Sequence, residues 1–91
     1  MRLRMIGIDH STAQIAVRER FAFTKSAAEQ ALQTLKNIKG VRGCVLLSTC
    51  NRMELYVSVD EDTRMDLCAW ICEYRQLPVE PNRVYFCPRE G

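Results

Sequence analysis

Five polar or reactive side chains follow one another in the middle of this 91-residue chain. They are Ser48, Thr49, Cys50, Asn51 and Arg52. Two leucines precede the run and a hydrophobic pattern resumes at Met53, so the run lies at the end of a strand that is expected to be buried. A plain β-hairpin would favour Asn-Gly or Asp-Gly at such a turn. The turn instead carries a thiol, hydroxyls, an amide and a guanidinium, which are groups that chemistry can use.

These side chains permit more than one chemistry. The thiol of Cys50 could act as a nucleophile, because a nearby cation such as Arg52 lowers the pKa of a thiol and raises its thiolate fraction. Arg52 could instead hold a carboxylate through its planar pair of donors, and Glu54 could orient Arg52 through an ion pair. Thr49 and Asn51 can donate hydrogen bonds to a carbonyl or carboxylate. A polar hairpin with a half-buried cysteine is the alternative that involves no chemistry.

Length and composition indicate one small domain. The chain is 47% hydrophobic, and no run approaches the roughly 18 apolar residues of a membrane span. Its first residues, MRLRMIGIDH, become polar too early for a signal peptide, so we expect a cytoplasmic protein with no membrane segment. The net charge of +2 is uneven, since residues 1–43 are basic and residues 44–91 are acidic. A basic half could meet a nucleic-acid backbone, but solvated helix faces explain it as well.

The cysteine pattern argues against a disulfide framework or a zinc site. Five cysteines form no CxxC pair, and the single histidine, His10, leaves too few ligands for structural zinc. We therefore expect no metal. Cys50 is distinguished by its polar neighbours. The other four are interpreted as small buried hydrophobic side chains: Cys44, Cys68, Cys72 and Cys87.

Hydrophobic periodicity and turn residues predict alternating strands and helices. Residues 3–9 are expected to form a strand, and the pair Ser11 and Gln14 a capping box that opens a short helix ending near Phe21. A second capping box, at Ser26 and Glu29, precedes an apolar stripe with helical spacing. This stripe consists of Ala28, Ala31, Leu32, Leu35 and Ile38.

Later elements follow from the same signals. Gly40 occupies the position of a helix C-terminal cap, and the acids of the segment DEDT are expected to begin the last helix, where the helix dipole favours them. Pro78 and Pro81 are expected to end that helix. The expected strands and helix in this half are residues 43–49, 53–59, 62–76 and 83–87.

The element order predicts an α+β fold. The expected arrangement is a ferredoxin-like split β-α-β unit, with a four-stranded antiparallel sheet and the helices on one face. In the strand at 53–59, apolar and polar residues alternate, so one face of that strand is expected to be buried. This fold places residues 48–52 in a β–β connection at a strand terminus.

Two segments of the sequence resemble the glutamyl-tRNA reductase family. The first matches the family's Gly-x-x-His-x-Thr-Ala-Pro…Arg-Glu pattern through Gly7, His10, Thr12, Ala13, Arg18 and Glu19. The second matches Ser-Thr-Cys-Asn-Arg-x-Glu through Ser48, Thr49, Cys50, Asn51, Arg52 and Glu54. Gln14 stands where the family usually has proline. Proline is favourable but not required at the start of a helix, so this departure changes little.

The resemblance implies functions for the second segment and for His10, and Arg18 and Glu19 are expected to be structural or to lie at the edge of the substrate site. In the family, the thiolate that corresponds to Cys50 attacks the ester joining glutamate to its transfer RNA, and NADPH reduces the resulting thioester to glutamate-1-semialdehyde for tetrapyrrole synthesis. By the same resemblance, Thr49, Asn51 and Arg52 hold the glutamyl group, and Glu54 supports them. Ser48 and His10 are also expected in supporting positions, His10 through a capping or hydrogen-bonding role at the strand-to-helix turn rather than as a base for the thiol.

The resemblance covers residues 1–91, but the family's enzymes are several times longer. We expect the chain to be the N-terminal portion of the catalytic domain, without the nucleotide-binding and dimerisation domains, because no glycine-rich dinucleotide fingerprint occurs in it. NADPH is then bound outside this chain, and the fragment alone is expected to be inactive. The implied partners are glutamyl-tRNA, a second copy in the full-length homodimer and the downstream aminomutase. The alternative is a non-enzymatic ferredoxin-like module that binds RNA or protein, for which base stacking would need more exposed aromatics than Tyr56.

Overall fold

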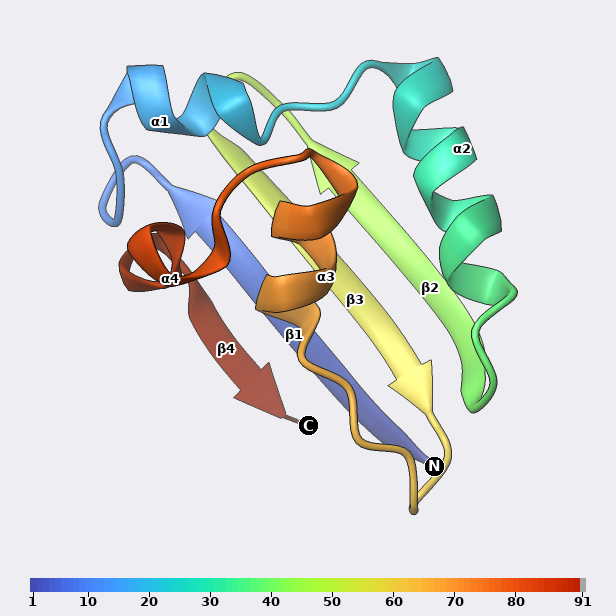
Figure 1. Cartoon of the computed structure of the whole chain (residues 1–91). Coiled ribbons are helices and arrows are strands. Elements are labelled where there is room, and N and C mark those ends of the chain that lie inside the picture. The colour runs from blue at the N-terminus through green and yellow to red at the C-terminus, as the bar shows by residue number, and fades with distance from the viewer. Residues whose placement is uncertain (91) are drawn as a thin grey trace.

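The computed structural model describes residues 1–90, and for residues 87–90 it describes the backbone alone (Figure 1). Strands and helices alternate along the chain. The elements are β1 (Arg2–Asp9), α1 (Ile15–Arg20), α2 (Lys25–Lys36), β2 (Val41–Ser48), β3 (Arg52–Val59), α3 (Leu67–Tyr74), α4 (Val79–Asn82), a 3-10 turn (Arg83–Tyr85) and β4 (Cys87–Glu90). None of the helices in this part of the chain is long and apolar enough to cross a membrane.

The strands form one antiparallel sheet in the order β2-β3-β1-β4. The three long strands β2, β3 and β1 lie side by side, and the short β4 pairs with β1 at the edge. Leu55 of β3 lies opposite Ile6 of β1 and Leu46 of β2, so apolar side chains are aligned across the sheet. The predicted α+β class with an antiparallel sheet is confirmed.

One face of the sheet is covered by helices, and the core lies beneath them (Figure 1). In β3, the expected alternation is confirmed because Met53, Leu55, Val57 and Val59 are buried while the residues between them are partly exposed. The helices contribute buried side chains to the same core. These are Val17 from α1, Ala31 and Leu35 from α2, and Leu67, Cys68, Ile71 and Cys72 from α3.

Both predicted capping boxes are wrong, although the helices that follow them exist. Ser11 donates its hydroxyl to the Asp9 carboxylate at 2.6 Å, inside the turn after β1. The helix α1 therefore begins later, after Gln14, whose side chain makes no capping bond. The helix α2 begins one residue before Ser26, because the hydroxyl of Thr24 accepts the Ala27 N–H at 3.1 Å and acts as the N-cap.

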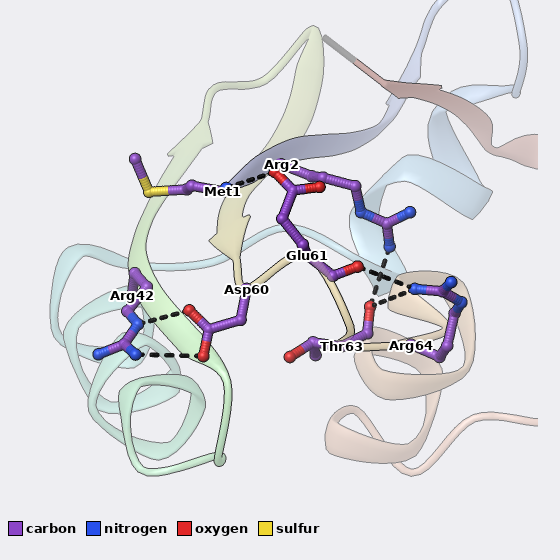
Figure 2. A network of polar contacts seen from close by, with 7 residues as sticks. All are labelled: Met1, Arg2, Arg42, Asp60, Glu61, Thr63 and Arg64. Carbon is purple, nitrogen blue, oxygen red and sulfur yellow. Dashed lines mark hydrogen bonds and ion pairs between the residues drawn. The ribbon is translucent and has the colours of Figure 1, made fainter.

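The acids expected at the start of the last helix are used elsewhere. Asp60 binds Arg42 through two hydrogen bonds, and Glu61 binds the N-terminal amine, as Figure 2 shows. The helix α3 begins only at Leu67, where the carboxylate of Asp66 accepts the N–H of Ala69 at 3.0 Å. The expected range 62–76 was therefore too long, because local ion pairs compete for these carboxylates with the helix terminus.

Three further expectations about the ends of elements are also wrong. Helix α2 ends at Lys36 with Asn37 as its C-cap, and Gly40 lies in the following turn with a φ of +93°. The prolines do not end α3: Pro78 is the N-cap of α4, and Pro81 lies within α4. The expected strand at 83–87 is a 3-10 turn, followed by β4.

The cysteines are distributed as the composition indicated, with one partial exception. Cys68 and Cys72 are buried in the core, which confirms the prediction for these two. Cys44 is half-buried, and its thiol lies 3.7 Å from the carbonyl oxygen of Leu32. The side chain of Cys87 lies outside the described residues. Cys50 is exposed.

Candidate active site

The β2–β3 connection is a short loop with its own hydrogen bonds. The N–H of Thr49 donates to the carbonyl of Arg52 at 2.8 Å and closes the hairpin. The hydroxyl oxygen of Thr49 accepts the N–H groups of Asn51 and Arg52, each at 3.2 Å. The hydroxyl of Thr49 therefore shapes the loop around Cys50, while its O–H remains a donor.

Two bonds from other elements tie this loop to the fold. The backbone N–H of Phe23, which precedes α2, donates to the hydroxyl of Ser48 at 3.0 Å. The guanidinium of Arg18, on α1, donates from one nitrogen to the carbonyl oxygens of Cys50 at 3.5 Å and Asn51 at 3.3 Å. The loop is thus held at its base by Ser48 and at its tip by α1.

A pocket of about 240 Å³ opens between α1 and this loop. It is lined by Ile15, Arg18, Glu19, Ala22, Thr49 and Cys50. Apolar groups, a cation, a carboxylate and the exposed thiol therefore surround one small volume. Such a mixture suits a small polar ligand that is held in one orientation.

A larger hollow of about 540 Å³ lies elsewhere, along β1 and the start of α3. Its thiol is Cys68, which is buried, and burial raises the pKa of this thiol. A buried thiol with a raised pKa is a poor nucleophile. Despite its smaller volume, the pocket beside Cys50 is the better candidate for covalent chemistry.

The thiols differ sharply in their surroundings. Partial burial raises the pKa of the Cys44 thiol, and burial raises that of Cys72 to about 12. A thiolate is therefore disfavoured at both positions near neutral pH. Among the cysteines whose side chains are described, only Cys50 is exposed. The accessible thiol is the one that the sequence singled out.

The remaining predicted site residues lie at the same end of the sheet but outside the pocket lining. Arg52 is exposed and pairs with Asp9 across the β1–β3 ladder, and its guanidinium has no bonded partner within residues 1–86. Glu54 lies two residues further along the strand, and no ion pair joins it to Arg52. Asn51 is exposed, and His10 is exposed in the turn after β1. No hydrogen bond links His10 to Cys50 in the described part of the chain.

Two residues of the pocket, Arg18 and Glu19, were expected only to be structural or to lie at the edge of the substrate site, and the structure places both in the pocket lining. They lie more than 30 positions before Cys50, on the short helix α1. The available signal was their place in the first of the two family-like segments. Neither charge nor spacing indicated that α1 packs beside the β2–β3 connection.

Comparison with known proteins assigns the chain to a family. The family described as "Glutamyl-tRNAGlu reductase, N-terminal domain" matches residues 6–90. The chain belongs to the glutamyl-tRNA reductase family. Two similar relatives are the glutamyl-tRNA reductases of Pseudomonas paraeruginosa and Pseudomonas aeruginosa, each 45% identical over 78 residues. That match covers 86% of this chain and 18% of each relative.

The glutamyl-tRNA reductase match includes every residue of the candidate site. Both family-like segments lie within residues 6–90, as do the pocket-lining residues of α1 and of the β2–β3 connection. The chain spans about a fifth of the length of the curated relatives that it matches.

Proposed function

We propose that Cys50 is the nucleophile of a glutamyl-tRNA reductase, and that residues 1–91 form the N-terminal portion of its catalytic domain. The observation that carries this proposal is the exposed thiol of Cys50 beside the small pocket between α1 and the β2–β3 connection, in a chain of this family. The neighbouring bonds of Thr49 and Ser48 support it, because they hold the loop in one shape. A fixed loop favours the reaction, since orientation of the attacking atom lowers the barrier.

In the proposed reaction, the Cys50 thiolate attacks the carbonyl carbon of the ester between glutamate and transfer RNA. A sulfur–carbon bond forms, the bond from that carbon to the ribose oxygen breaks, and the ribose oxygen takes up a proton. The product is a glutamyl thioester on Cys50. A thioester accepts hydride more readily than an oxygen ester, which suits its reduction to glutamate-1-semialdehyde.

NADPH supplies the hydride in the proposed complete reaction, but the described residues do not fit this cofactor. A dinucleotide pyrophosphate needs close approach of the backbone at a glycine-rich strand-to-helix turn. The turn between β1 and α1 contains no glycine and is folded around Asp9, whose carbonyl accepts the N–H groups of Thr12 and Ala13. We therefore place the NADPH site in the longer enzyme, outside this chain.

The glutamyl group is proposed to be held by Thr49, Asn51 and Arg52. The hydroxyl and amide can donate to its carbonyl oxygen, and the planar guanidinium suits its carboxylate. The unpartnered guanidinium of Arg52 within residues 1–86 supports this assignment. Glu54 and His10 are proposed to support the positions of these residues without contacting the substrate.

The finer architecture and the cellular context belong to the same proposal. The antiparallel strand order β2-β3-β1-β4 supports a ferredoxin-like split β-α-β unit. Glutamyl-tRNA as the substrate, a homodimer of the longer enzyme, an interaction with the aminomutase and a cytoplasmic location remain predictions. Of the alternative RNA- or protein-binding module, the RNA-binding form lacks support, because the uncovered sheet face presents exposed Leu3, Val45 and Leu47 rather than a set of aromatic rings.

A small substrate tests the proposal without requiring contacts to transfer RNA. The chain is incubated with the benzyl thioester of glutamate, quenched in acid and digested for mass spectrometry. We expect one glutamyl group on Cys50 and none in a Cys50→Ser variant. A correctly folded chain that forms no adduct, or forms it first on Cys44, would contradict the assignment of Cys50.

The same assay tests Arg52. Lysine retains the positive charge but cannot form the paired hydrogen bonds of a guanidinium. In Arg52→Lys, we expect the activation free energy for acylation of Cys50 by the glutamyl thioester to rise by about 2–5 kcal/mol. The variant should also lose the preference for the glutamyl thioester over the shorter alanyl thioester. Its alkylation by iodoacetamide should be unchanged. A variant that keeps its preference for glutamyl over alanyl would show that Arg52 does not bind the carboxylate.

A further inference from the structure

The candidate site contains a cation that the proposed reaction does not use. Arg18 extends from α1 toward the β2–β3 connection, and one of its terminal nitrogens contacts two consecutive backbone carbonyls, those of Cys50 and Asn51. Its Nε is buried without a hydrogen-bond partner among the described residues. Burying an unpaired donor costs free energy, so fold stability alone does not account for this side chain.

We propose that Arg18 is a positioning residue, whose guanidinium fixes the carbonyls of Cys50 and Asn51 against α1 and thereby directs the Cys50 thiol into the adjoining pocket. This inference rests on the proposed role of Cys50. It assigns Arg18 no contact with the substrate and no transfer of a proton. Its function is to limit the directions that the nucleophile can take.

The geometry of the peptide group explains how a carbonyl contact can aim a thiol. The carbonyl carbon and the Cβ of Cys50 are both attached to its Cα, and the peptide unit is planar. Once the carbonyl oxygen is held toward Arg18, rotation of the loop tip is restricted. The Cα–Cβ bond of Cys50, which carries the thiol, then remains directed toward the same side of the loop. The hydroxyl of Thr49 fixes the internal shape of the loop but does not connect the loop to α1.

The helix that carries Arg18 is itself anchored. Val17 is buried in the core, and Phe21, at the C-terminus of α1, is fully buried and contacts Phe86 edge-on at a ring-centroid distance of 5.0 Å. The side chain of Arg75 also donates to the carbonyl of Arg20 at 3.1 Å. The contacts of Arg18 with the two carbonyls, called the clamp below, therefore connect the tip of the loop to a segment that is fixed by the core.

The test compares two reactions of the same thiol. Acylation by the glutamyl benzyl thioester requires the thiol to face the pocket, whereas alkylation by iodoacetamide requires only an accessible thiol. We expect Arg18→Gln to reduce the maximal acylation rate of Cys50 roughly tenfold to hundredfold, as a small misplacement of a reacting atom does. The thioester concentration at half-maximal rate and the alkylation rate should each change by less than about twofold.

Two variants serve as controls. Arg18→Lys should recover part of the acylation rate, because an ammonium can bond to a carbonyl but lacks the fixed geometry of a guanidinium. Arg20→Gln, on the same helix but outside the pocket lining, should react as the unaltered chain does. Wild-type acylation in Arg18→Gln would overturn the inference. Equal losses of acylation and alkylation with a lowered melting temperature would also overturn it, because they indicate a purely structural role.

Amide hydrogen exchange separates this inference from the proposed function. If Arg18 holds the loop tip, the Asn51 and Arg52 amides should exchange about three to ten times faster in Arg18→Gln, as expected for loss of a charged hydrogen bond in a partly exposed loop. Unchanged exchange would overturn the clamp whether or not Cys50 is acylated. Faster exchange in a chain whose Cys50 is never acylated would refute both the proposed function and the directing role of Arg18. It would show only that Arg18 holds the tip of the loop.

Discussion

The differing surroundings of the thiols predict a strict order of alkylation. Limited treatment with iodoacetamide at pH 8 should modify Cys50 before Cys44, and Cys44 before Cys68 and Cys72. Cys50 is exposed, Cys44 is half-buried and the other two are buried. The experiment is best made in a Cys87→Ser background, so that only the four thiols with described side chains compete.

The expected separation in rate is large. Burial raises the pKa of the Cys72 thiol from an ordinary 9.0 to about 12, so only about one molecule in ten thousand carries the thiolate at pH 8. Without this shift, the same thiol would be roughly one-tenth thiolate at pH 8. The raised pKa therefore lowers the thiolate fraction of Cys72, and with it the alkylation rate, by about a thousandfold. Limited reagent access adds to this because the side chain is 0% exposed. Cys72 should react only when the fold opens.

Peptide mapping by mass spectrometry over a time course measures this order. A Cys50→Ser variant is the control, and it should lose the fast phase while retaining the slow one. Mild urea should accelerate only the slow phase, because it populates the opened chain. Early modification of Cys68 or Cys72 without denaturant would refute the burial argument, and early modification of Cys44 would refute the special accessibility of Cys50.

Three other perturbations test the fold that holds the site. Gly40→Ala should lower the free energy of unfolding by about 2 kcal/mol, measured by urea titration, because φ is +93° and a Cβ would lie 2.1 Å from the Thr63 hydroxyl; adding Thr63→Ala should recover part of the loss. Asp66→Ala should cost about 1–2 kcal/mol, and Asp66→Asn less, because asparagine can still cap α3. The hydrogen bonds from Arg83 lower the pKa of Asp66 in the folded chain. The stability that the ionised Asp66 contributes should therefore be lost as the pH falls from about 4, the pKa in the unfolded chain, through the lower pKa in the folded chain. At alkaline pH the unfolded Cys72 thiol releases its proton near pH 9 and the folded one near pH 12, so stability should fall between these values, by up to about 1.4 kcal/mol per pH unit, and Cys72→Ala should reduce that slope.

The parts of the fold that were predictable are those set by burial along one element. Apolar residues at every second position of β3 can be buried only if the strand has one covered face, and the structure confirms this. Helix ends were less predictable because several polar groups compete for each terminus. Ser11 could have capped α1, but the Asp9 carboxylate two residues away accepts its hydroxyl instead. Asp60 likewise binds Arg42, 18 positions away, and is unavailable to α3.

The candidate site divides in the same way. Residue types in a polar turn identified Cys50 as the thiol to consider, and its exposure agrees with that interpretation. The direction of the Thr49 hydroxyl could not be predicted, because it depends on the turn that its own bonds to Asn51 and Arg52 create. The contact from Arg18 joins residues 32 and 33 positions apart. Such a contact depends on how α1 lies against the sheet, which local patterns do not specify.

The two arginines at this end of the sheet, Arg18 and Arg52, are therefore not equivalent. One terminal nitrogen of Arg18 is engaged by two backbone carbonyls, and its Nε is buried, so its free donors have little room to meet a ligand in the paired geometry of a carboxylate. Arg52 is exposed and keeps its whole guanidinium unpartnered within residues 1–86. A carboxylate that approaches the Cys50 loop could therefore accept two parallel hydrogen bonds from the guanidinium of Arg52. These bonding patterns support the proposed division of roles, in which Arg18 would orient Cys50 and Arg52 would bind the substrate carboxylate.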